Sequence, residues 1–195
     1  MFTYYDTANQ PPAQGWSPIA EYSSAEQIEN ATLIHNYLTQ NLGFTTNSAC
    51  AVIGNIQHES YLNPAQWEVS VGATTGGYGL VQWTPPANVI NYITNRTDGY
   101  EQCQWINDCV SALGQWIDVM GFGSWTDFKA STDDAYYLAQ VFLRNYERGL
   151  SVERRYTNAR YWYEYFEPVP PPPPTREKGK IIFYLRNPNH LIRRM

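Results

Sequence analysis

The stretch Ala51-Val-Ile-Gly-Asn-Ile-Gln-His-Glu-Ser-Tyr-Leu-Asn-Pro64 predicts a buried helix that ends at a single carboxylate. Hydrophobic residues recur at helical spacing as far as Ile56, and Glu59 continues the same stripe three residues later. Asn47 is the expected N-cap of this helix. The closing proline ends it, because the residue before a proline avoids helical geometry.

Glu59 combines two conditions that raise the pKa of a carboxyl group. Desolvation on an apolar face and the negative end of the helix dipole both disfavour the charged form. A carboxyl that stays protonated near neutral pH can act as a general acid. The alternative interpretation is a partly exposed glutamate at a frayed helix end.

A second informative stretch is Gly76-Gly-Tyr-Gly-Leu-Val-Gln-Trp-Thr-Pro-Pro86. Its glycines permit a tight turn, and residues 80–84 have the composition of a strand. A flat aromatic side chain with amide and hydroxyl neighbours suits a sugar ring, so Trp83 and Thr84 are expected to line a cleft. The alternative is an ordinary hairpin with Trp83 in the core.

Taken together, these segments resemble the phage tail lysozyme family, within the goose-type lysozyme and soluble lytic transglycosylase group. Glu59-Ser60, Gly79-Leu80-Val81-Gln82 and Asn145-Tyr146 occur in the order typical of that group. The run from Ala139 to Arg148 also resembles a helix that recurs in tail lysozymes. The resemblance covers roughly residues 24–166, and its motifs are specific together but weak singly. The nearest likeness is to the glycosidase domain of tail-tip peptidoglycan hydrolases of small short-tailed phages.

The resemblance implies a virion-associated peptidoglycan glycosidase that opens the bacterial wall during infection. Its target would be the β-1,4 bond between N-acetylmuramic acid and N-acetylglucosamine, with Glu59 as general acid. Neither a cofactor nor a metal is expected. The substrate-binding residues that it implies are Ser60, Tyr78, Gln82, Trp83, Thr84 and Tyr146. A non-catalytic structural or glycan-binding tail component with the same fold is the alternative.

The sequence does not decide how the reaction proceeds after Glu59 has donated its proton. A hydrolase needs another carboxylate to activate water or to act as nucleophile. Glu68 and Asp98 are the nearest acidic candidates in the sequence, although each is more typical of a surface charge. In the lytic transglycosylases that the motifs resemble, one glutamate suffices and the product is a 1,6-anhydro sugar. Next to Glu59, His58 points to a different side of the helix and is expected to play no catalytic part.

Length, composition and charge argue against several other classes of protein. The chain has 195 residues and a net charge of −5, and this acidic balance disfavours nucleic-acid binding. No apolar run approaches the ~20 residues needed to span a bilayer, and the N-terminus lacks the features of a signal peptide. Three cysteines argue against a disulfide framework, and the scattered histidines argue against a metal site.

Periodicity and caps predict an α+β, mostly helical, lysozyme-like fold with one small β-hairpin beside the active-site cleft. The hairpin is expected within residues 65–84. Helices are predicted at about 24–42, 47–63, 85–95, 101–120, 125–128, 132–142 and 152–166. The 132–142 helix is expected to be capped by Thr132.

Four segments are expected along the chain. They are an extended arm at 1–22, the glycosidase domain at 23–167, a polyproline linker at 168–174 and a basic tail at 175–195. The tail has a net charge of +5 (six Lys/Arg, one Glu), whereas the remainder has −10 (seven Lys/Arg, seventeen Asp/Glu). The arm and the tail are therefore predicted to dock on other phage tail proteins, and an oligomer within the phage tail is a further expectation. Disorder is the alternative for the basic tail.

Overall fold

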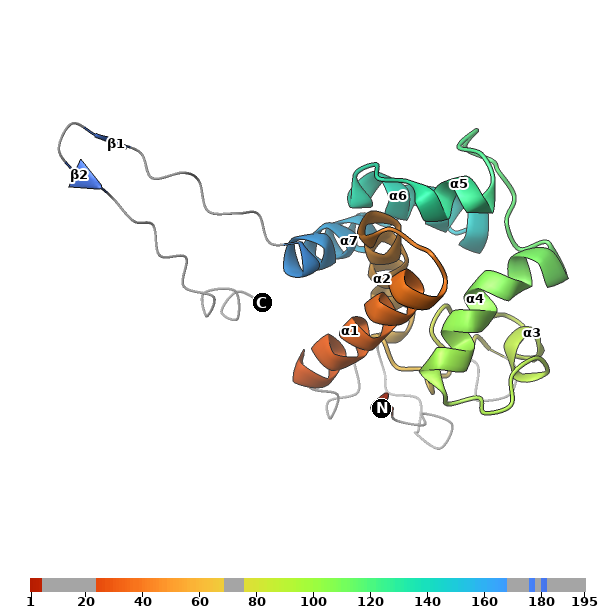
Figure 1. The fold of residues 1–195 in the computed structure, drawn as a ribbon. Coiled ribbons are helices and arrows are strands. Elements are labelled where there is room, and N and C mark those ends of the chain that lie inside the picture. The colour runs from red at the N-terminus through yellow and green to blue at the C-terminus, as the bar shows by residue number, and fades with distance from the viewer. Residues whose placement is uncertain (5–23, 69–75, 168–175, 178–179, 182–195) are drawn as a thin grey trace.

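The computed structural model describes residues 1–4, 24–68, 76–167, 176–177 and 180–181 (Figure 1). The described part is mostly helical. Its helices are α1 (Ser24–Asn41), α2 (Thr46–Ser60), α3 (Ala87–Ile90), α4 (Gly99–Leu113), α5 (Trp125–Ala130), α6 (Ala135–Phe142), the π-helical turn η2 (Leu143–Glu147) and α7 (Glu153–Phe166). Two short strands, β1 (Arg176–Glu177) and β2 (Lys180–Ile181), pair antiparallel.

Helix α2 is the central element of the fold. It packs against α1, α5, α6 and α7, which surround it in Figure 1. Ten of its fifteen residues are buried, as expected for a helix that has neighbours on several sides. The predicted apolar stripe is confirmed, because Ala49, Val52, Ile53 and Ile56 are all fully buried.

Both predicted N-caps lie close to the true caps but are wrong. Thr45 caps α2, and its side-chain oxygen accepts a hydrogen bond from the backbone N–H of Ser48 at 3.1 Å. Asn47 instead donates to the carbonyl oxygen of Asp133 at 3.0 Å. Helix α6 is capped by Asp134 in place of Thr132. Threonine and aspartate are as good at this position as the residues predicted, so sequence alone does not rank neighbouring caps.

Two helices are shorter than predicted. Helix α4 ends at Leu113, because Gly114 adopts the left-handed conformation (φ 63°) that terminates helices. The residues that follow run as an irregular segment, and Ile117, expected inside the helix, is half exposed. Helix α3 ends at Ile90 and not near Asn95.

The β-hairpin expected beside the cleft is not found in the described residues 65–68 and 76–84. These residues form two isolated β-bridges, Trp67 with Tyr78 and Tyr78 with Trp83. The chain turns tightly between the last two residues, with Gly79 at φ 79° and Gln82 at φ 50°. The backbone N–H of Leu80 is satisfied by a side chain of α4 and not by a strand.

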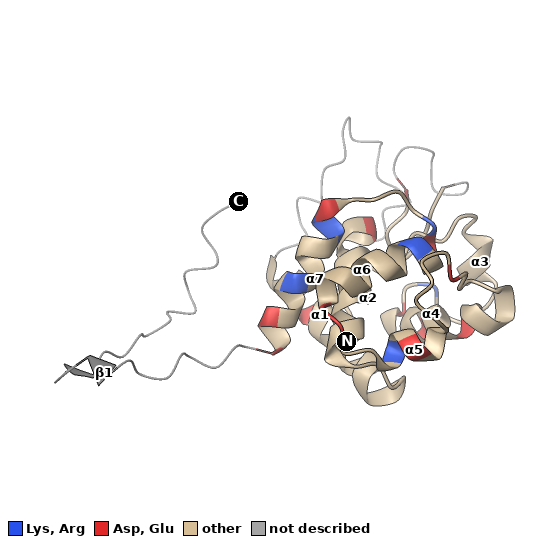
Figure 2. Cartoon of the chain, turned by 90° about the horizontal axis from the view of Figure 1, so that it is seen from above, with Lys and Arg blue, Asp and Glu red and all other residues tan. Residues whose placement is uncertain are grey.

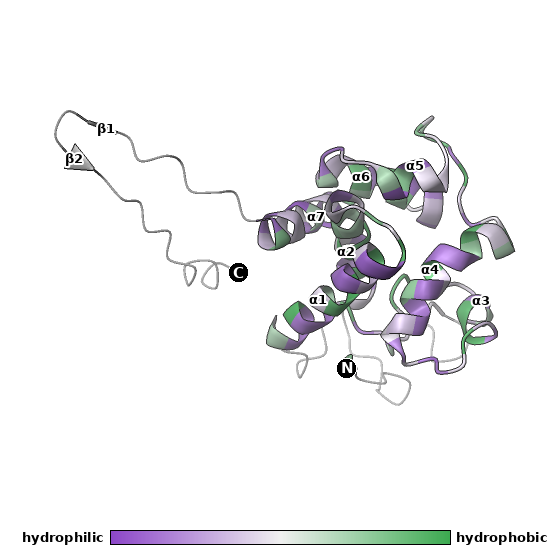
Figure 3. Cartoon of the chain, in the orientation of Figure 1, coloured by the Kyte–Doolittle hydropathy of each residue, from purple (hydrophilic) through white to green (hydrophobic). Residues whose placement is uncertain are grey.

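The helices share one hydrophobic core that is rich in aromatic rings. Phe142 stacks on Tyr146 with ring centroids 4.5 Å apart, and Trp125 stacks on Phe128 at 5.3 Å. Hydrophobic and hydrophilic residues are mixed along α1, α4 and α7 in Figure 3, as expected for helices that each turn one face to this core. All three cysteines are free and buried in it, in agreement with the sequence.

The first four residues lie against the helical body. The Phe2 side chain is buried and meets the Tyr100 ring edge to face at 4.9 Å. The backbone N–H and carbonyl of Thr3 bond to the Asn30 side chain at 3.1 and 2.7 Å. The rest of the predicted arm and most of the predicted tail lie outside the described residues.

Charged residues are sparse on the helical body, as the few blue and red segments of Figure 2 show. Among the residues that the structure describes, no helix has the length and hydropathy required to cross a membrane. The same residues contain no group of three side chains suited to hold a metal ion.

Candidate active site

Glu59 lies in the last turn of α2, where the sequence predicted it. The helix ends one residue later, and Tyr61 and Leu62 both adopt left-handed backbone conformations, with φ 54° and 69°. This sharp exit turns the chain away from the helix axis. The Glu59 side chain is therefore left 20% exposed, while the turns before it are buried.

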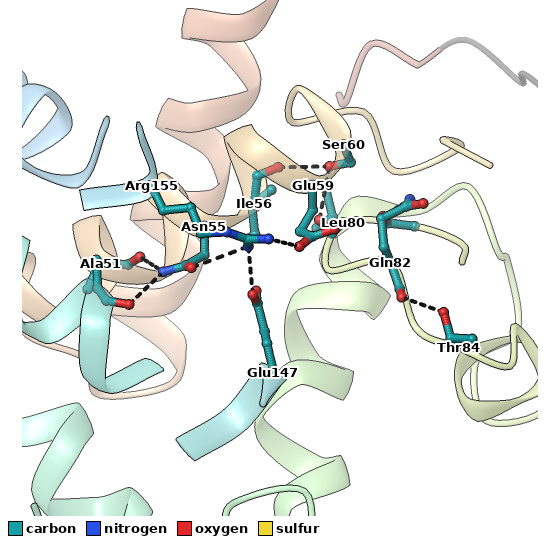
Figure 4. A network of polar contacts seen from close by, with 12 residues as sticks. Ala51, Asn55, Ile56, Glu59, Ser60, Leu80, Gln82, Thr84, Glu147 and Arg155 are labelled. Atoms are coloured by element: carbon teal, nitrogen blue, oxygen red, sulfur yellow. Dashed lines mark hydrogen bonds and ion pairs between the residues drawn. The ribbon is translucent and has the colours of Figure 1, made fainter. Parts of the chain in front are cut away.

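Arg155 of α7 bridges two carboxylates at this point (Figure 4). One terminal nitrogen, Nη2, donates to Glu59 Oε1. The other, Nη1, donates to Glu147 Oε2 at 2.7 Å and to the Asn55 side-chain oxygen at 3.4 Å. Asn55 is itself fixed, because its amide donates to the carbonyl of Ala51 at 2.9 Å and to a carbonyl of α6. A planar guanidinium thus holds two acidic side chains in one place.

The close approach of α7 to α2 puts Arg155 within reach of Glu59. A Cβ atom at Gly54 would lie 2.5 Å from the Ala159 nitrogen and 2.6 Å from the Arg155 carbonyl oxygen. Only glycine leaves room for two helix backbones at this separation. Gly54, five residues before Glu59, therefore allows the close helix contact that brings Arg155 to Glu59.

Glu147 ends the π-helical turn η2, which continues α6. Its side chain is 8% exposed, and its buried Oε1 atom has no hydrogen-bond partner among the residues that the structure describes. Burial raises the pKa of Glu147 well above its usual range, the negative charge of Glu59 adds to this effect, and Arg155 opposes it. Widened helical turns of this kind are frequent at functional sites.

The opposite side of the site is the turn from Gly79 to Thr84. The Ser60 hydroxyl donates to the Leu80 carbonyl at 3.0 Å, which fastens this turn to the end of α2. From α4, the Gln102 side chain accepts from the Leu80 N–H at 2.8 Å. The Gln82 amide donates to the carbonyl oxygens of Gln66 and Gly79 at 3.1 and 2.9 Å. Each of these bonds holds the turn in place beside Glu59.

A cavity of about 220 Å³ opens between these parts. It runs from Glu59 along the 81–84 turn and α3 on one side and along the end of η2 on the other. Its lining residues are Glu59, Val81, Gln82, Trp83, Thr84, Asn88, Gln115, Tyr146, Glu147, Arg148 and Gly149. Acidic, amide, hydroxyl and aromatic groups thus face one space, which is the arrangement that a polyhydroxylated ring requires.

Comparison with known proteins agrees with this geometry. The sequence profile described as phage tail lysozyme matches residues 29–166, which include both walls of the cavity. The chain belongs to the phage tail lysozyme family. It is also 36% identical over 156 residues to Morphogenesis protein 1 of Bacillus phage B103, covering 76% of this chain and 42% of that relative. The chain thus spans less than half of the relative's length. Its family makes it a protein associated with the phage virion and tail.

Five of the residues that the sequence assigned to the site of this tail lysozyme domain line the cavity. They are Glu59, Gln82, Trp83, Thr84 and Tyr146. The Tyr146 ring is 1% exposed and its hydroxyl lies 2.9 Å from the Cys109 sulfur, so the residue contributes a wall and little free surface.

The other two assigned residues, Ser60 and Tyr78, lie behind the cavity wall. Both are fully buried. Ser60 joins α2 to the Leu80 turn, and the Tyr78 hydroxyl donates to the Arg96 carbonyl at 3.0 Å. Their positions suit support of the wall and do not suit contact with a substrate.

Sequence reasoning missed Glu147 and Arg155. The acidic candidates that it named lie elsewhere, since Glu68 accepts from the Gly77 N–H at 2.9 Å and Asp98 caps α4. The signal was present in α7, where Arg155 takes an otherwise apolar position four and seven residues before Ala159 and Trp162. A charged residue on an apolar stripe is the same signal that pointed to Glu59.

Two residues next in sequence to the acids, Arg148 and His58, do not join this ion-pair network. Glu147 pairs with Arg155 and not with the adjacent Arg148, whose guanidinium donates to the Gln115 carbonyl at 3.0 Å. Burial and the charges of Arg155 and Arg154 lower the pKa of His58 to about 4. His58 is therefore neutral at physiological pH and does not line the cavity.

Proposed function

We propose that this tail lysozyme domain is a peptidoglycan glycosidase with Glu59 as its general acid. The bond that it cleaves would be the β-1,4 linkage between N-acetylmuramic acid and N-acetylglucosamine. The observation that carries the proposal is the position of Glu59, a partly exposed carboxyl group at a helix end that faces a cavity lined by polar and aromatic groups. The domain would open the bacterial wall locally while the phage genome enters the cell.

The chemistry requires a proton at the glycosidic oxygen as the carbon–oxygen bond breaks. Glu59 would deliver that proton, and an oxocarbenium-like transition state would form in the cavity. Gln82 and Thr84 would supply polar contacts, and the Trp83 ring would offer an apolar face to the sugar. Carboxylate charge beside the reaction centre would stabilise the positive charge that develops.

The family and the relative also support the substrate and the partner proteins that we propose. Peptidoglycan would be the substrate, and other phage tail proteins would be the partners, through the arm at 1–22 and the basic tail at 175–195. The relative is more than twice as long as the segment that it shares with this chain. Any activity carried by the rest of such a protein, including peptide cleavage, would come from outside the domain described here.

A non-catalytic role in the tail is the second candidate, and one observation favours it. The Glu59 carboxylate is engaged by Arg155 in an ion pair, and a permanent ion pair could serve only to hold α2 and α7 together. In that case the domain would be a structural or glycan-binding component, in keeping with the word morphogenesis in the relative's name.

Mass spectrometry of purified peptidoglycan fragments separates the two candidates. The wild-type protein, Glu59→Gln and the control Glu164→Gln would be compared under identical conditions. Glutamine keeps the size and hydrogen bonding of glutamate but cannot deliver an acid proton. Glu164 is an exposed residue of α7, so its replacement controls for the loss of one negative charge. We expect soluble fragments from the wild type and the control, and none from Glu59→Gln.

The fragments also identify the reaction. Ends with 1,6-anhydro-muramic acid would show a lytic transglycosylase, in which Glu59 acts alone on the sugar. Reducing muramic ends, heavier by one water, would show a hydrolase. Equal fragment yields from wild type and a correctly folded Glu59→Gln would refute Glu59 as general acid. The absence of fragments from all three proteins would favour the non-catalytic role.

A further inference from the structure

We propose that Glu147 stores the proton that Glu59 delivers, and that Arg155 moves its positive charge between the two carboxyl groups as the proton moves. This inference rests on the proposed glycosidase function and assigns two further residues to it. It follows from three features of the site, namely the shared guanidinium, the unequal burial of the two acids and the unpartnered oxygen of Glu147.

The shared guanidinium makes the two acids one titrating unit. Glu59 Oε1 and Glu147 Oε2 bind the two terminal nitrogens of Arg155. Two carboxylates and one guanidinium would leave a net negative charge in a largely buried site, which is costly. Retention of one proton by the pair makes the site neutral. Acids this close titrate together and do not lose their protons independently.

Burial decides which acid holds that proton in the resting protein. Glu147 is 8% exposed, whereas Glu59 is 20% exposed and borders the cavity. The neutral form is favoured at the more buried site, in agreement with the raised pKa of Glu147. Glu147 Oε1 accepts no hydrogen bond from any residue in the described part of the chain, so it can carry the proton.

The other groups around the pair keep their charge state near neutral pH. Burial raises the pKa of Tyr146, beside Glu147, well above its usual range, so its hydroxyl stays protonated. His58 of α2, next to Glu59, is neutral because its pKa is about 4. Arg148, which lines the same cavity, is always charged and is bound to Gln115. Among the residues that the structure describes around the pair, only the two carboxyl groups can therefore exchange a proton.

The exchange removes a difficulty in the proposed mechanism. A carboxyl group paired with a guanidinium is a poor proton donor, because the positive charge stabilises its ionised form. The Glu147 carboxyl group would first rotate so that this proton meets water in the cavity, which Glu147 lines, and that water would pass a proton to the Glu59 carboxylate. Arg155 would then pair with the newly ionised Glu147, and Glu59 would become the neutral acid that general-acid catalysis needs.

The proton balance then closes over one catalytic cycle. Glu59 gives its proton to the glycosidic oxygen, the carbon–oxygen bond breaks, and the leaving sugar departs as an alcohol. Two carboxylates and one guanidinium remain, and their net negative charge stabilises the positive charge of the oxocarbenium ion. Glu59 next takes a proton from the attacking hydroxyl, from water or from the muramic acid 6-position. That proton returns to Glu147 when Arg155 turns back to Glu59.

The pH dependence of wall cleavage tests the delivery step. Rates of peptidoglycan clearing would be measured from pH 4 to 9 for wild type, Glu147→Gln and the control Glu164→Gln. Without Glu147, the remaining acid faces Arg155 alone and loses its proton at lower pH. We expect the alkaline limb of the Glu147→Gln profile to move by at least about one pH unit towards acid, with roughly tenfold lower activity at pH 7.

Activity near the acidic end of the range should survive in Glu147→Gln, because protons from the solvent there replace the one that Glu147 stores. If Glu147 had a purely structural role, its replacement would instead lower the rate by the same factor at every pH. That outcome, or a profile that matches the wild type, would overturn the proposal. Thermal unfolding of each variant would confirm that the compared proteins are folded.

A second measurement reports the stored proton without any need for activity. Carbon-13 NMR of wild-type protein labelled at its glutamate carboxyl groups should show one protonated glutamate at pH 7. This signal should be absent from Glu147→Gln. In Glu59→Gln it should titrate at lower pH, because the negative neighbour is gone and Arg155 turns wholly to Glu147.

The two measurements distinguish the possible failures. Full ionisation of every glutamate at pH 7 in the wild type would overturn the stored proton, even if the protein cleaves peptidoglycan. A stored proton in a protein that cuts no glycan would overturn the glycosidase function, and the delivery step with it.

Discussion

At the scale of single residues, Gly54 shows how one backbone position controls the chemistry of another. It belongs to α2 and carries no functional group, yet it sets how closely α7 can approach. Arg155 reaches Glu59 only because the two backbones pass each other at a glycine. The same contact positions Asn55, which steadies the guanidinium at 3.4 Å.

Replacement of Gly54 by alanine should destabilise the protein. A methyl group here meets backbone atoms, which cannot rotate away, so α2 and α7 must separate. We expect a loss of about 1–3 kcal/mol in the free energy of unfolding, despite the better helix propensity of alanine. Urea denaturation measures this loss. Gly149→Ala is the matched control, since its new methyl group meets only the flexible Leu143 side chain. Equal stability of both variants would contradict the packing argument.

At the scale of elements, the wall of the cavity depends on α4 as much as on α2. Gln102 is fully buried, and its side chain accepts from the Leu80 N–H and donates to the carbonyl oxygens of Pro64 and Arg96. Three segments that are far apart in sequence are thus fixed by one amide. The turn that carries Gln82 and Trp83 has its position because of this contact and the Ser60 bond.

Gln102→Leu should weaken both the fold and the site. The change keeps the approximate volume but leaves the buried Leu80 N–H and the buried Pro64 carbonyl without a partner, whereas the Arg96 carbonyl keeps the Tyr78 hydroxyl. Each such group costs about 1–3 kcal/mol, so we expect the unfolding free energy to fall by at least about 2 kcal/mol. Gln104→Leu, two residues away in α4, is the control because its hydrogen bonds lie near the surface. A comparable loss in the control would argue against a special role for Gln102.

The segment between α4 and α5 is held in place by the side chain of Asn145, which lies in η2. Asn145 of η2 accepts from the N–H groups of Val119 and Met120 at 3.1 and 3.2 Å, and its amide donates to Asp118 at 2.9 Å. Asp118 in turn accepts from the N–H groups of residues 122 and 123. The helix predicted to run through this segment is replaced by side-chain to backbone bonds of this kind.

This arrangement predicts how the segment responds to acid. The backbone N–H bonds from Phe122 and Gly123 lower the pKa of Asp118 below its usual value of 3.8. A lowered pKa means that the stabilising contribution is complete above that value and is lost as the pH falls below it. Amide proton shifts of Phe122 and Gly123, followed by NMR from pH 6 to 2, should titrate with a midpoint below 3.8. Asp118→Asn should remove this titration, and its persistence would refute the assignment.

At the scale of the whole molecule, stability and charge are distributed differently along the chain. Within the described residues, the buried hydrophobic cluster extends from Phe2 to Trp162, and Phe166 packs against it. The net charge is −10 for residues 1–174 and +5 for residues 175–195. The helical domain therefore contains the packing that the structure describes, and the basic tail contributes charge.

A chain shortened after Glu167 should keep the stability of the full chain. All residues of the described core remain, so we expect the midpoint of thermal unfolding to change by less than about 2 °C, which corresponds to at most about 1 kcal/mol. Differential scanning calorimetry of both chains at equal ionic strength measures this. A shift of 5 °C or more would show that the residues after 167 contribute to the folded domain.

The sequence determined the helical character of the fold, the position of Glu59 and five residues of the cavity. The helical character and the position of Glu59 follow from local rules, because the spacing of apolar residues, a proline and glycines act within one or two turns of chain. Gln82 and Tyr146 were expected only from the resemblance to tail lysozymes. Helices α1, α2, α5 and α7 accordingly lie within a few residues of their predicted ranges. The interval between two helices carries no such periodic signal. There the expected hairpin is not shown by the described residues, and the predicted length of α4 was wrong.

Only the tertiary structure brought Glu147 and Arg155 to Glu59. These residues are 88 and 96 positions away in the chain, and no local pattern encodes a contact across that distance. The contact depends on the Gly54 crossing of α2 and α7 and on the widened turn at the end of α6. The sequence indicated Glu59 alone. Packing decided that Glu59 shares the Arg155 guanidinium with Glu147 and, in our proposal, a proton as well.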